Sequence, residues 1–218
     1  MKPLIDPINL SNHLALTRNR LTERNNVMKN VFIVCLLFLA AVSKAYPQAS
    51  AGVRGGILYS HLKGPLPTST ITGWEVGVFS KAEIGEGGAY FQPEIDYSLK
   101  GGKVAYHDSS FVLRMQYASV RLLGIYNFTD WLYAGGGGFF SFLVKTDQDK
   151  EFVKPDYFFP FALGVVLTTG VQMSFVTLGV RYDSGLSVLT KQADPEVAGN
   201  ALQNEKIKAL QLTLGVSF

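Results

Sequence analysis

The stretch that decides the fold is Leu210-Gln211-Leu212-Thr213-Leu214-Gly215-Val216-Ser217-Phe218. Every second residue is large and apolar, and the residues between are small or polar. Because successive side chains of a strand point to opposite faces, this period of two predicts a strand with one wholly apolar face. Such a face meets a protein core in a soluble sheet and lipid in an outer-membrane barrel.

Seven further segments upstream alternate in the same way. The eight predicted strands are 51–60, 73–83, 89–99, 111–126, 131–144, 157–168, 173–184 and 208–218. Each is near the roughly 9 to 11 residues with which a tilted strand crosses a bilayer. Long connections (61–72, 100–110, 145–156 and 185–207) alternate with short ones (84–88, 127–130 and 169–172). This pattern predicts an all-β, eight-stranded antiparallel up-and-down transmembrane β-barrel with short periplasmic turns and long extracellular loops.

The polar face of these strands carries charges of both signs. The expected lumen charge network consists of Arg54, Glu75, Glu94, Asp96, Arg181 and Asp183, with Arg114 and Arg121 as further candidates. The interior of an eight-stranded barrel is just filled by side chains, and charges away from water persist when they are paired. The sequence therefore predicts an ion-paired plug rather than an open pore.

Alternation alone does not say which face is outside. A soluble, periplasmic, lipocalin-like carrier would turn its apolar face inward around a ligand. Three features favour the membrane: a polar face rich in Gly, Ser and Thr, aromatic residues near strand ends, and a secretion signal together with the C-terminal aromatic residue. The aromatic residues in question are Trp74, Tyr97, Trp131, Phe159 and Tyr182.

The first 45 residues have the organisation of an export signal. Residues 1–27 show no periodicity and are interpreted as an unstructured leader, or as the product of a start site assigned upstream of Met28. Residues 28–45 place Lys29 before an apolar run from Val31 to Val42 and small residues at its end, as in a secretory signal peptide. We expect cleavage after Ala45, with Ala51 as the second choice, and a barrel over 46–218. The alternative is an N-terminal membrane anchor, but the run is shorter than the roughly 18 residues that span a bilayer.

Removing the signal changes the charge of the chain. Residues 1–45 hold six of the 20 basic and two of the 17 acidic residues, which leaves 14 against 15 and a net charge of −1. The basic excess therefore predicts no nucleic-acid partner. Cys35, the one cysteine, lies in the signal, so disulfides, thiolate metal sites and cysteine nucleophiles are not expected in the mature chain.

The fourth strand departs from simple alternation. Leu113, Met115 and Tyr117 share one face, whereas Val120 and Leu122 share the other. We expect a bulge near Ala118 or Ser119 to absorb this change of phase.

Four blocks of sequence, in order, carry a family resemblance over 51–218. They are Ala51-Gly52-Val53-Arg54-Gly55-Gly56-Ile57-Leu58-Tyr59-Ser60, Phe91-Gln92-Pro93-Glu94-Ile95-Asp96-Tyr97-Ser98-Leu99-Lys100-Gly101, Ala134-Gly135 and Arg181-Tyr182-Asp183-Ser184-Gly185-Leu186. The chain resembles the PorT-like "porin family" outer-membrane β-barrel domain. The resemblance implies an eight-stranded barrel without an assigned transport or enzymatic activity. Arg121 departs from it, since members usually have proline in the fourth strand.

Three other motifs are weak candidates for chemistry. Gly135 to Gly138 lack the following Lys-Ser/Thr of a phosphate loop and are expected to make room for bulky neighbours. Asp147, Asp149 and Glu151 lack the glycine and distal glutamate of a calcium loop. His61, and His107 with Asp108, Ser109 and Ser110, have no second motif to support catalysis. We therefore expect no catalytic, cofactor-binding or metal site.

The sequence favours a non-enzymatic outer-membrane protein that acts in surface structure or binding. The alternative functions are a component of an envelope secretion or assembly machine and, if the apolar face points inward, a soluble periplasmic carrier. The expected partners are outer-membrane lipid and the barrel-assembly machinery, which would recognise Leu214, Val216 and Phe218 of the closing strand. No extracellular ligand is identified by the sequence.

Overall fold

A computed structural model of the chain describes residues 49–64, 67–85, 87–106, 109–148, 159–189 and 205–218. The expected leader, signal peptide and cleavage after Ala45 lie outside these residues. Within the described ranges, no helix is long and apolar enough to span a membrane.

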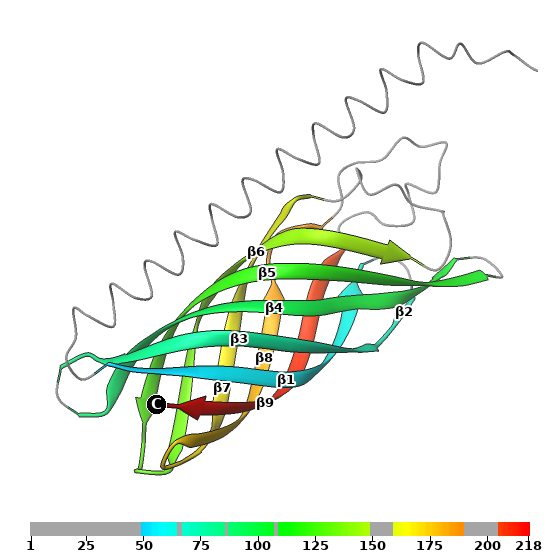
Figure 1. Cartoon of the computed structure of the whole chain (residues 1–218). Coiled ribbons are helices and arrows are strands. Elements are labelled where there is room, and N and C mark those ends of the chain that lie inside the picture. The colour runs from blue at the N-terminus through cyan, green and yellow to red at the C-terminus, as the bar shows by residue number, and fades with distance from the viewer. Residues whose placement is uncertain (1–48, 65–66, 86, 107–108, 149–158, 190–204) are drawn as a thin grey trace, which may run out of the picture. The chain divides into compact units, whose positions relative to one another are not determined.

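Eight long strands form a closed antiparallel barrel (Figure 1). Each strand pairs with its neighbours in sequence, β1 pairs with β9, and the pairing of β4 with β5 completes the ring. The long strands are β1 (Ser50–Lys63), β3 (Ile71–Glu83), β4 (Ala89–Tyr106), β5 (Ser109–Asn127), β6 (Leu132–Gln148), β7 (Phe161–Met173), β8 (Val176–Gly185) and β9 (Lys206–Ser217). A short ninth strand, β2 (Thr68–Ser69), pairs with the end of β4. The predicted eight-stranded transmembrane barrel is confirmed.

The short turns and the C-terminus lie at one rim, which we call the turn rim (Figure 1). There the amide of Phe218 donates to the carbonyl of Ala51 at 2.8 Å, so the end of β9 is held against the start of β1. The turn after β3 uses Gly85, Gly87 and Gly88 at positive φ, which a glycine adopts without steric cost. We call the opposite end of the barrel the loop rim.

Two predicted connections are wrong. Residues 100–110 were expected to form a long loop, but β4 and β5 continue as a hairpin to Tyr106 and Ser109. Residues 169–172 were expected to form a turn, but β7 continues to Met173 and the turn falls at 174–175, where Ser174 has a positive φ. Both errors arose because backbone pairing carries a strand through residues whose side chains look loop-like.

The expected bulge near Ala118 or Ser119 is also wrong. Strand β5 keeps its period of two throughout, with Tyr117, Ser119 and Arg121 all buried on the inward face. The register shift lies instead between Gln116 and Tyr117 in the pairing with β6, where Val144 is the additional residue. The apparent change of phase in the sequence reflects an inward face that is apolar near the loop rim and charged at mid-height.

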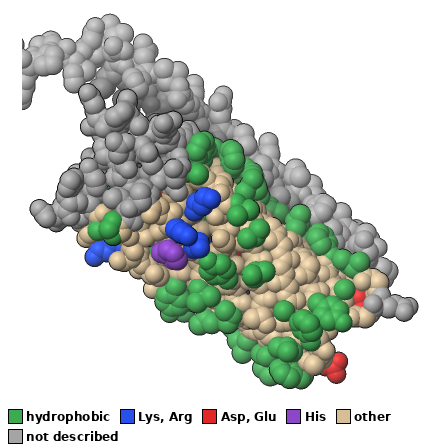
Figure 2. All heavy atoms as spheres, turned by 180° about the vertical axis from the view of Figure 1, so that it is seen from behind, with side chains coloured by type: hydrophobic (Ala, Val, Ile, Leu, Met, Phe, Trp, Pro, Cys, Tyr) green, Lys and Arg blue, Asp and Glu red, His purple; other side chains and the backbone are tan. Residues whose placement is uncertain are grey.

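Many apolar side chains project from the outer surface of the barrel in the view of Figure 2. Leu167 is 63% exposed and Leu212 is 56% exposed, although both are aliphatic. Exposed aromatic residues also gather at the turn rim: Phe128, Trp131, Phe175 and Phe218. The apolar face therefore points outward, which overturns the lipocalin-like alternative, because a ligand carrier would turn that face into its interior.

The interior contains three layers. Near the loop rim an apolar cluster surrounds Leu113, Met115 and Tyr117, and near the turn rim a second cluster includes Leu123 and Phe139. The charged residues lie between them. The interior is therefore not polar throughout. On the turn-rim side the apolar cluster is mixed with polar residues, including Lys81, whose ammonium donates to Gln172 at 2.9 Å.

Candidate functional site: the lumen charge network

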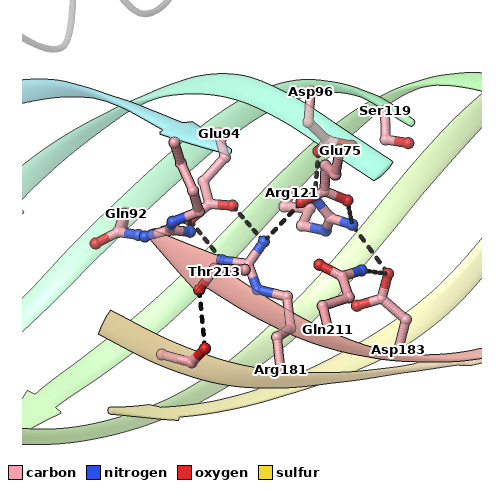
Figure 3. A network of polar contacts seen from close by, with 12 residues as sticks. Glu75, Gln92, Glu94, Asp96, Ser119, Arg121, Arg181, Asp183, Gln211 and Thr213 are labelled. Carbon is pink, nitrogen blue, oxygen red and sulfur yellow. Dashed lines mark hydrogen bonds and ion pairs between the residues drawn. The ribbon is translucent and has the colours of Figure 1, made fainter. Parts of the chain in front are cut away.

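Arg121 of β5 is the residue around which the charged layer is built (Figure 3). Its side chain has no exposed surface. The guanidinium donates to Glu75 of β3 at 2.8 Å, to Asp183 of β8 at 2.9 Å, and to Asp96 of the adjacent β4. One arginine thus connects four strands, including β8 on the other side of the lumen.

Arg181 of β8 forms a second centre beside the first. Its guanidinium pairs with Glu94 of β4 at 2.9 Å and with Glu75 at 3.5 Å. Glu94 also accepts from Arg54 of β1 and, at 2.6 Å, from the Gln92 side-chain amide. These contacts join β1, β3, β4 and β8 across the interior.

Asp183 closes the network on the β8 side. Besides Arg121, it accepts from the Lys100 ammonium of β4 at 2.7 Å and from the Gln211 amide of β9 at 2.9 Å. The ammonium of Lys100 also lies 5.5 Å from the centre of the Phe139 ring, within cation–π range. The carboxylate therefore anchors three neighbouring side chains.

The charges of this layer balance. Four cations (Arg54, Lys100, Arg121 and Arg181) face four carboxylates (Glu75, Glu94, Asp96 and Asp183). Taking such groups out of water costs several kcal/mol per ion, and mutual pairing approximately offsets that cost. The network accordingly adds little net stability compared with an apolar core, but it penalises any arrangement that leaves one member unpaired.

The side chains fill the lumen at the level of the network and next to it. One hollow near the turn rim, between Arg54, Phe79 and Tyr133, has a volume of about 10 Å³. That is roughly the space that one water molecule needs. What the arrangement does chemically is hold opposite charges against each other across the interior.

The six residues expected in the lumen all face inward and lie in this layer: Arg54, Glu75, Glu94, Asp96, Arg181 and Asp183. Of the two further candidates, Arg121 is the hub of the layer, whereas Arg114 is exposed on the outer face of β5. The prediction that Arg114 faces the lumen is wrong, because it was tied to the supposed change of phase in that strand.

Lys100 and the role of Gln211 were missed. Lys100 was assigned to the start of a loop, although its spacing of two and four residues from Ser98 and Asp96 places all three on one face of a continued strand. Gln211 stood on the polar face of the closing strand, but nothing local indicates that its partner is Asp183. That pairing follows from the register of β8 against β9, which sets Arg181 opposite Gln211.

No family model and no curated protein matches the sequence. Among solved structures, the chain is similar to Ail, the attachment invasion locus protein of Yersinia pestis, in complex with the heparin analogue sucrose octasulfate, at 12% identity and a TM-score of 0.42. It is also similar to Neisserial surface protein A, at 15% identity and a TM-score of 0.46. Each match covers 78% of this chain and 99% of the other. The Yersinia pestis outer membrane protein Ail in a phospholipid bilayer nanodisc matches at 10% identity and a TM-score of 0.43, over 78% of this chain and 100% of that one.

The weaker candidates lie away from the charged layer. His61 is on the outer face of β1, opposite Lys208 of β9. His107, Asp108, Asp149 and Glu151 lie outside the described residues. Asp147 forms an exposed ion pair with Lys145 at 2.9 Å. Within the described ranges, no group of three His, Cys, Asp or Glu side chains is arranged to hold a metal ion.

Two of the four consecutive glycines are required by close packing. A Cβ on Gly135 would lie 2.5 Å from the Ile125 Cδ1 atom, and one on Gly137 would lie 1.9 Å from the Leu122 carbonyl oxygen. Gly136 and Gly138 alternate with them and leave more room. The run lies inside β6, so it contributes to strand packing.

Proposed function

We propose that this chain is a non-enzymatic, integral outer-membrane protein of the PorT-like type, exported through a cleaved signal peptide, with a closed lumen and a surface role in structure or binding at the loop rim. The observation that carries the proposal is an apolar outer surface around an interior of paired charges. A soluble barrel reverses these two faces, because its outer surface meets water.

The apolar surface is where lipid would be the partner. Leu163, Val165 and Leu167 of β7 and Leu210, Leu212 and Leu214 of β9 are all exposed, with inward residues between them. Leaving these aliphatic side chains in water would cost free energy in proportion to their area, at about 25 cal/mol per Å². A bilayer removes that cost, which supports an outer-membrane location.

The lumen argues for a barrel that does not conduct solutes. The network spans the interior between β5 and β8, and apolar clusters lie on both sides of it. We expect the purified protein to show no stable conductance in planar lipid bilayers. Regular conductance steps of porin size would contradict a closed lumen.

The closing strand supports a role in assembly. Leu214, Val216 and Phe218 all lie on its exposed face, with Phe218 80% exposed at the turn rim. We propose that these residues are read by the barrel-assembly machinery before β9 closes against β1. Once the barrel has closed, the backbone of β9 is paired on both edges, so recognition would have to precede closure.

Heat modifiability of the isolated outer-membrane fraction tests the proposal. A closed membrane barrel keeps its fold in detergent at room temperature and unfolds on boiling, so the band should change mobility between the two treatments. The protein should be absent from the soluble periplasm. An unshifted band recovered with soluble periplasmic proteins would refute the membrane location.

A further inference from the structure

We propose that the outer wall formed by β1 and β9 binds a phosphate-bearing lipid of the leaflet at the loop rim, with the lipid phosphate on a basic patch and an acyl chain in the apolar groove below it. The basic patch consists of His61, Lys63, Lys206 and Lys208. This inference rests on the membrane location proposed above.

The basic patch is made by the register of two neighbouring strands. His61 lies directly opposite Lys208, and Lys63 lies directly opposite Lys206. Opposed side chains have Cβ atoms about 5 Å apart, and successive residues on one face of a strand are about 7 Å apart. Three ammonium groups and one imidazole therefore share an area that a single phosphate can bridge.

These groups point away from the lumen. The residues between them, Leu62 and Ile207, are buried in the apolar cluster of the interior, so the alternation turns the basic side chains outward. Figure 2 shows Lys and Arg side chains gathered beside the histidine toward one end of the barrel, next to apolar surface. The patch thus faces the surroundings of the barrel.

The charge of the patch is not compensated within the described part of the chain. None of its three lysines forms an ion pair with a described carboxylate. The acidic neighbour Glu205 is buried, and it precedes Lys206 on the opposite face. Like charges directly opposite each other destabilise a strand pair. A bound anion would remove that repulsion.

An apolar groove of the outer wall lies below the basic patch. On β1 and β9 it begins at Ile57 and Leu212, which oppose each other four residues from His61 and Lys208, and it extends over the neighbouring strands β3, β7 and β8. The exposed side chains of Tyr59 and Leu210, which also oppose each other, lie between the patch and the groove. The groove has a volume of about 890 Å³, and the side chains along it are apolar ones of the outer wall, including Ile57, Trp74, Leu178 and Leu212. Four residues of strand span about 13 Å, close to half the thickness of a bilayer core.

The basic patch and the apolar groove together indicate which class of ligand fits this surface. A nucleic acid or a sulfated polysaccharide would use the positive charge but has no apolar chain for the groove. A zwitterionic lipid would use the groove but brings a choline or amine that opposes the lysines. A lipid with an exposed phosphate satisfies both surfaces at once, and lysines near a membrane surface each contribute about a fivefold increase in affinity for anionic lipid.

Trp74 makes the proposal measurable, because it lines the groove. The mature chain would be refolded in phosphatidylcholine nanodiscs in a Trp131→Phe background, which leaves Trp74 as the one tryptophan. Phosphatidic acid with brominated acyl chains, which quench tryptophan at short range, would be compared with equally brominated phosphatidylcholine. We expect phosphatidic acid to quench Trp74 at a mole fraction up to roughly a hundredfold lower than the mole fraction of phosphatidylcholine that gives the same quenching. The reason is that each of the three lysines raises the affinity for the anionic lipid about fivefold.

The control variants distinguish the patch from the general charge of the barrel. Substituting glutamine for Lys63, Lys206 and Lys208 should remove the preference, whereas Lys103→Gln, an exposed lysine of β4, should leave it unchanged. Equal quenching by the two lipids, or a preference that survives the triple substitution, would overturn the proposal. Displacement of phosphatidic acid by inorganic phosphate or soluble heparin at matched charge would also overturn the proposal.

The comparison of the two lipids uses the unsubstituted patch, so it remains a valid test even if the triple variant does not refold. A heat-modifiable barrel without lipid preference refutes this inference alone, whereas a soluble protein refutes the membrane location.

Discussion

Arg121 offers the sharpest test of the lumen charge network. Replacing it with methionine keeps most of the side-chain volume but removes the cation that contacts Glu75, Asp96 and Asp183. The four-to-four balance becomes three cations facing four carboxylates. The three partners are not affected equally. Asp183 keeps Lys100 and Gln211, Glu75 keeps Arg181 at 3.5 Å, and Asp96 loses its ion-pair partner in the described structure.

The expected cost is therefore that of one uncompensated buried carboxylate. Breaking a buried pair by removing one partner typically costs about 3–5 kcal/mol, because the remaining charge stays away from water. We expect Arg121→Met to lower the free energy of unfolding by about 4 kcal/mol. Adding Asp96→Asn restores a balance of three to three, so the double variant should recover about 2 kcal/mol of that loss.

Urea unfolding of the barrel refolded into lipid vesicles measures these changes, followed by tryptophan fluorescence and by the gel shift of unboiled samples. Lys145→Met is the matched control, since its ion pair with Asp147 is exposed and should contribute no more than about 0.5 kcal/mol. The reasoning is refuted if Arg121→Met loses less than about 1 kcal/mol, or if the double variant is no more stable than the single one.

Three further predictions test the outer wall, the strand packing and the loop rim. Leu212→Lys should lower the free energy of unfolding in vesicles by about 2–4 kcal/mol, because it places a charge in lipid, and an unchanged value would mean that water surrounds this face. Gly137→Ala should lower the free energy of unfolding by about 1–3 kcal/mol in the same assay, because the added Cβ would lie 1.9 Å from the Leu122 carbonyl oxygen. The control Gly138→Ala, whose Cβ would have its nearest neighbour at 3.7 Å, should change that free energy by no more than about 0.5 kcal/mol. Equal effects of the two substitutions would contradict the close packing at Gly137. Burial raises the pKa of Glu205 from 4.5 to about 7, so the folded barrel holds that proton more tightly; the contribution of this group to stability should be full below pH 4.5 and be lost as the pH rises through 7. Glu205→Gln should remove this slope in parallel unfolding titrations, and a slope that persists in the variant would assign it to other groups.

The strands and the division of each strand into an apolar and a polar face were predictable because both depend on local spacing. In Leu210 to Phe218 the period of two is visible in the sequence, and β9 spans 206–217 with those apolar residues exposed. Arg54, Glu75 and Glu94 could be placed together on the polar face by the same rule, since each alternates with the apolar face of its strand. Local spacing failed in β5, where the inward residues change from apolar to charged along one unbroken strand.

The sequence by itself thus determined the strands and the division of each strand into an apolar and a polar face, because a pleated strand sorts its own side chains without reference to any other strand. The tertiary structure alone decided which charges meet. Closure of the barrel brings Arg121 and Asp183, 62 residues apart in sequence, to 2.9 Å across the lumen. It also sets Lys63 against Lys206 on the outer wall. Such pairings depend on the register and the closure of eight strands together, and no short stretch of the chain contains that information.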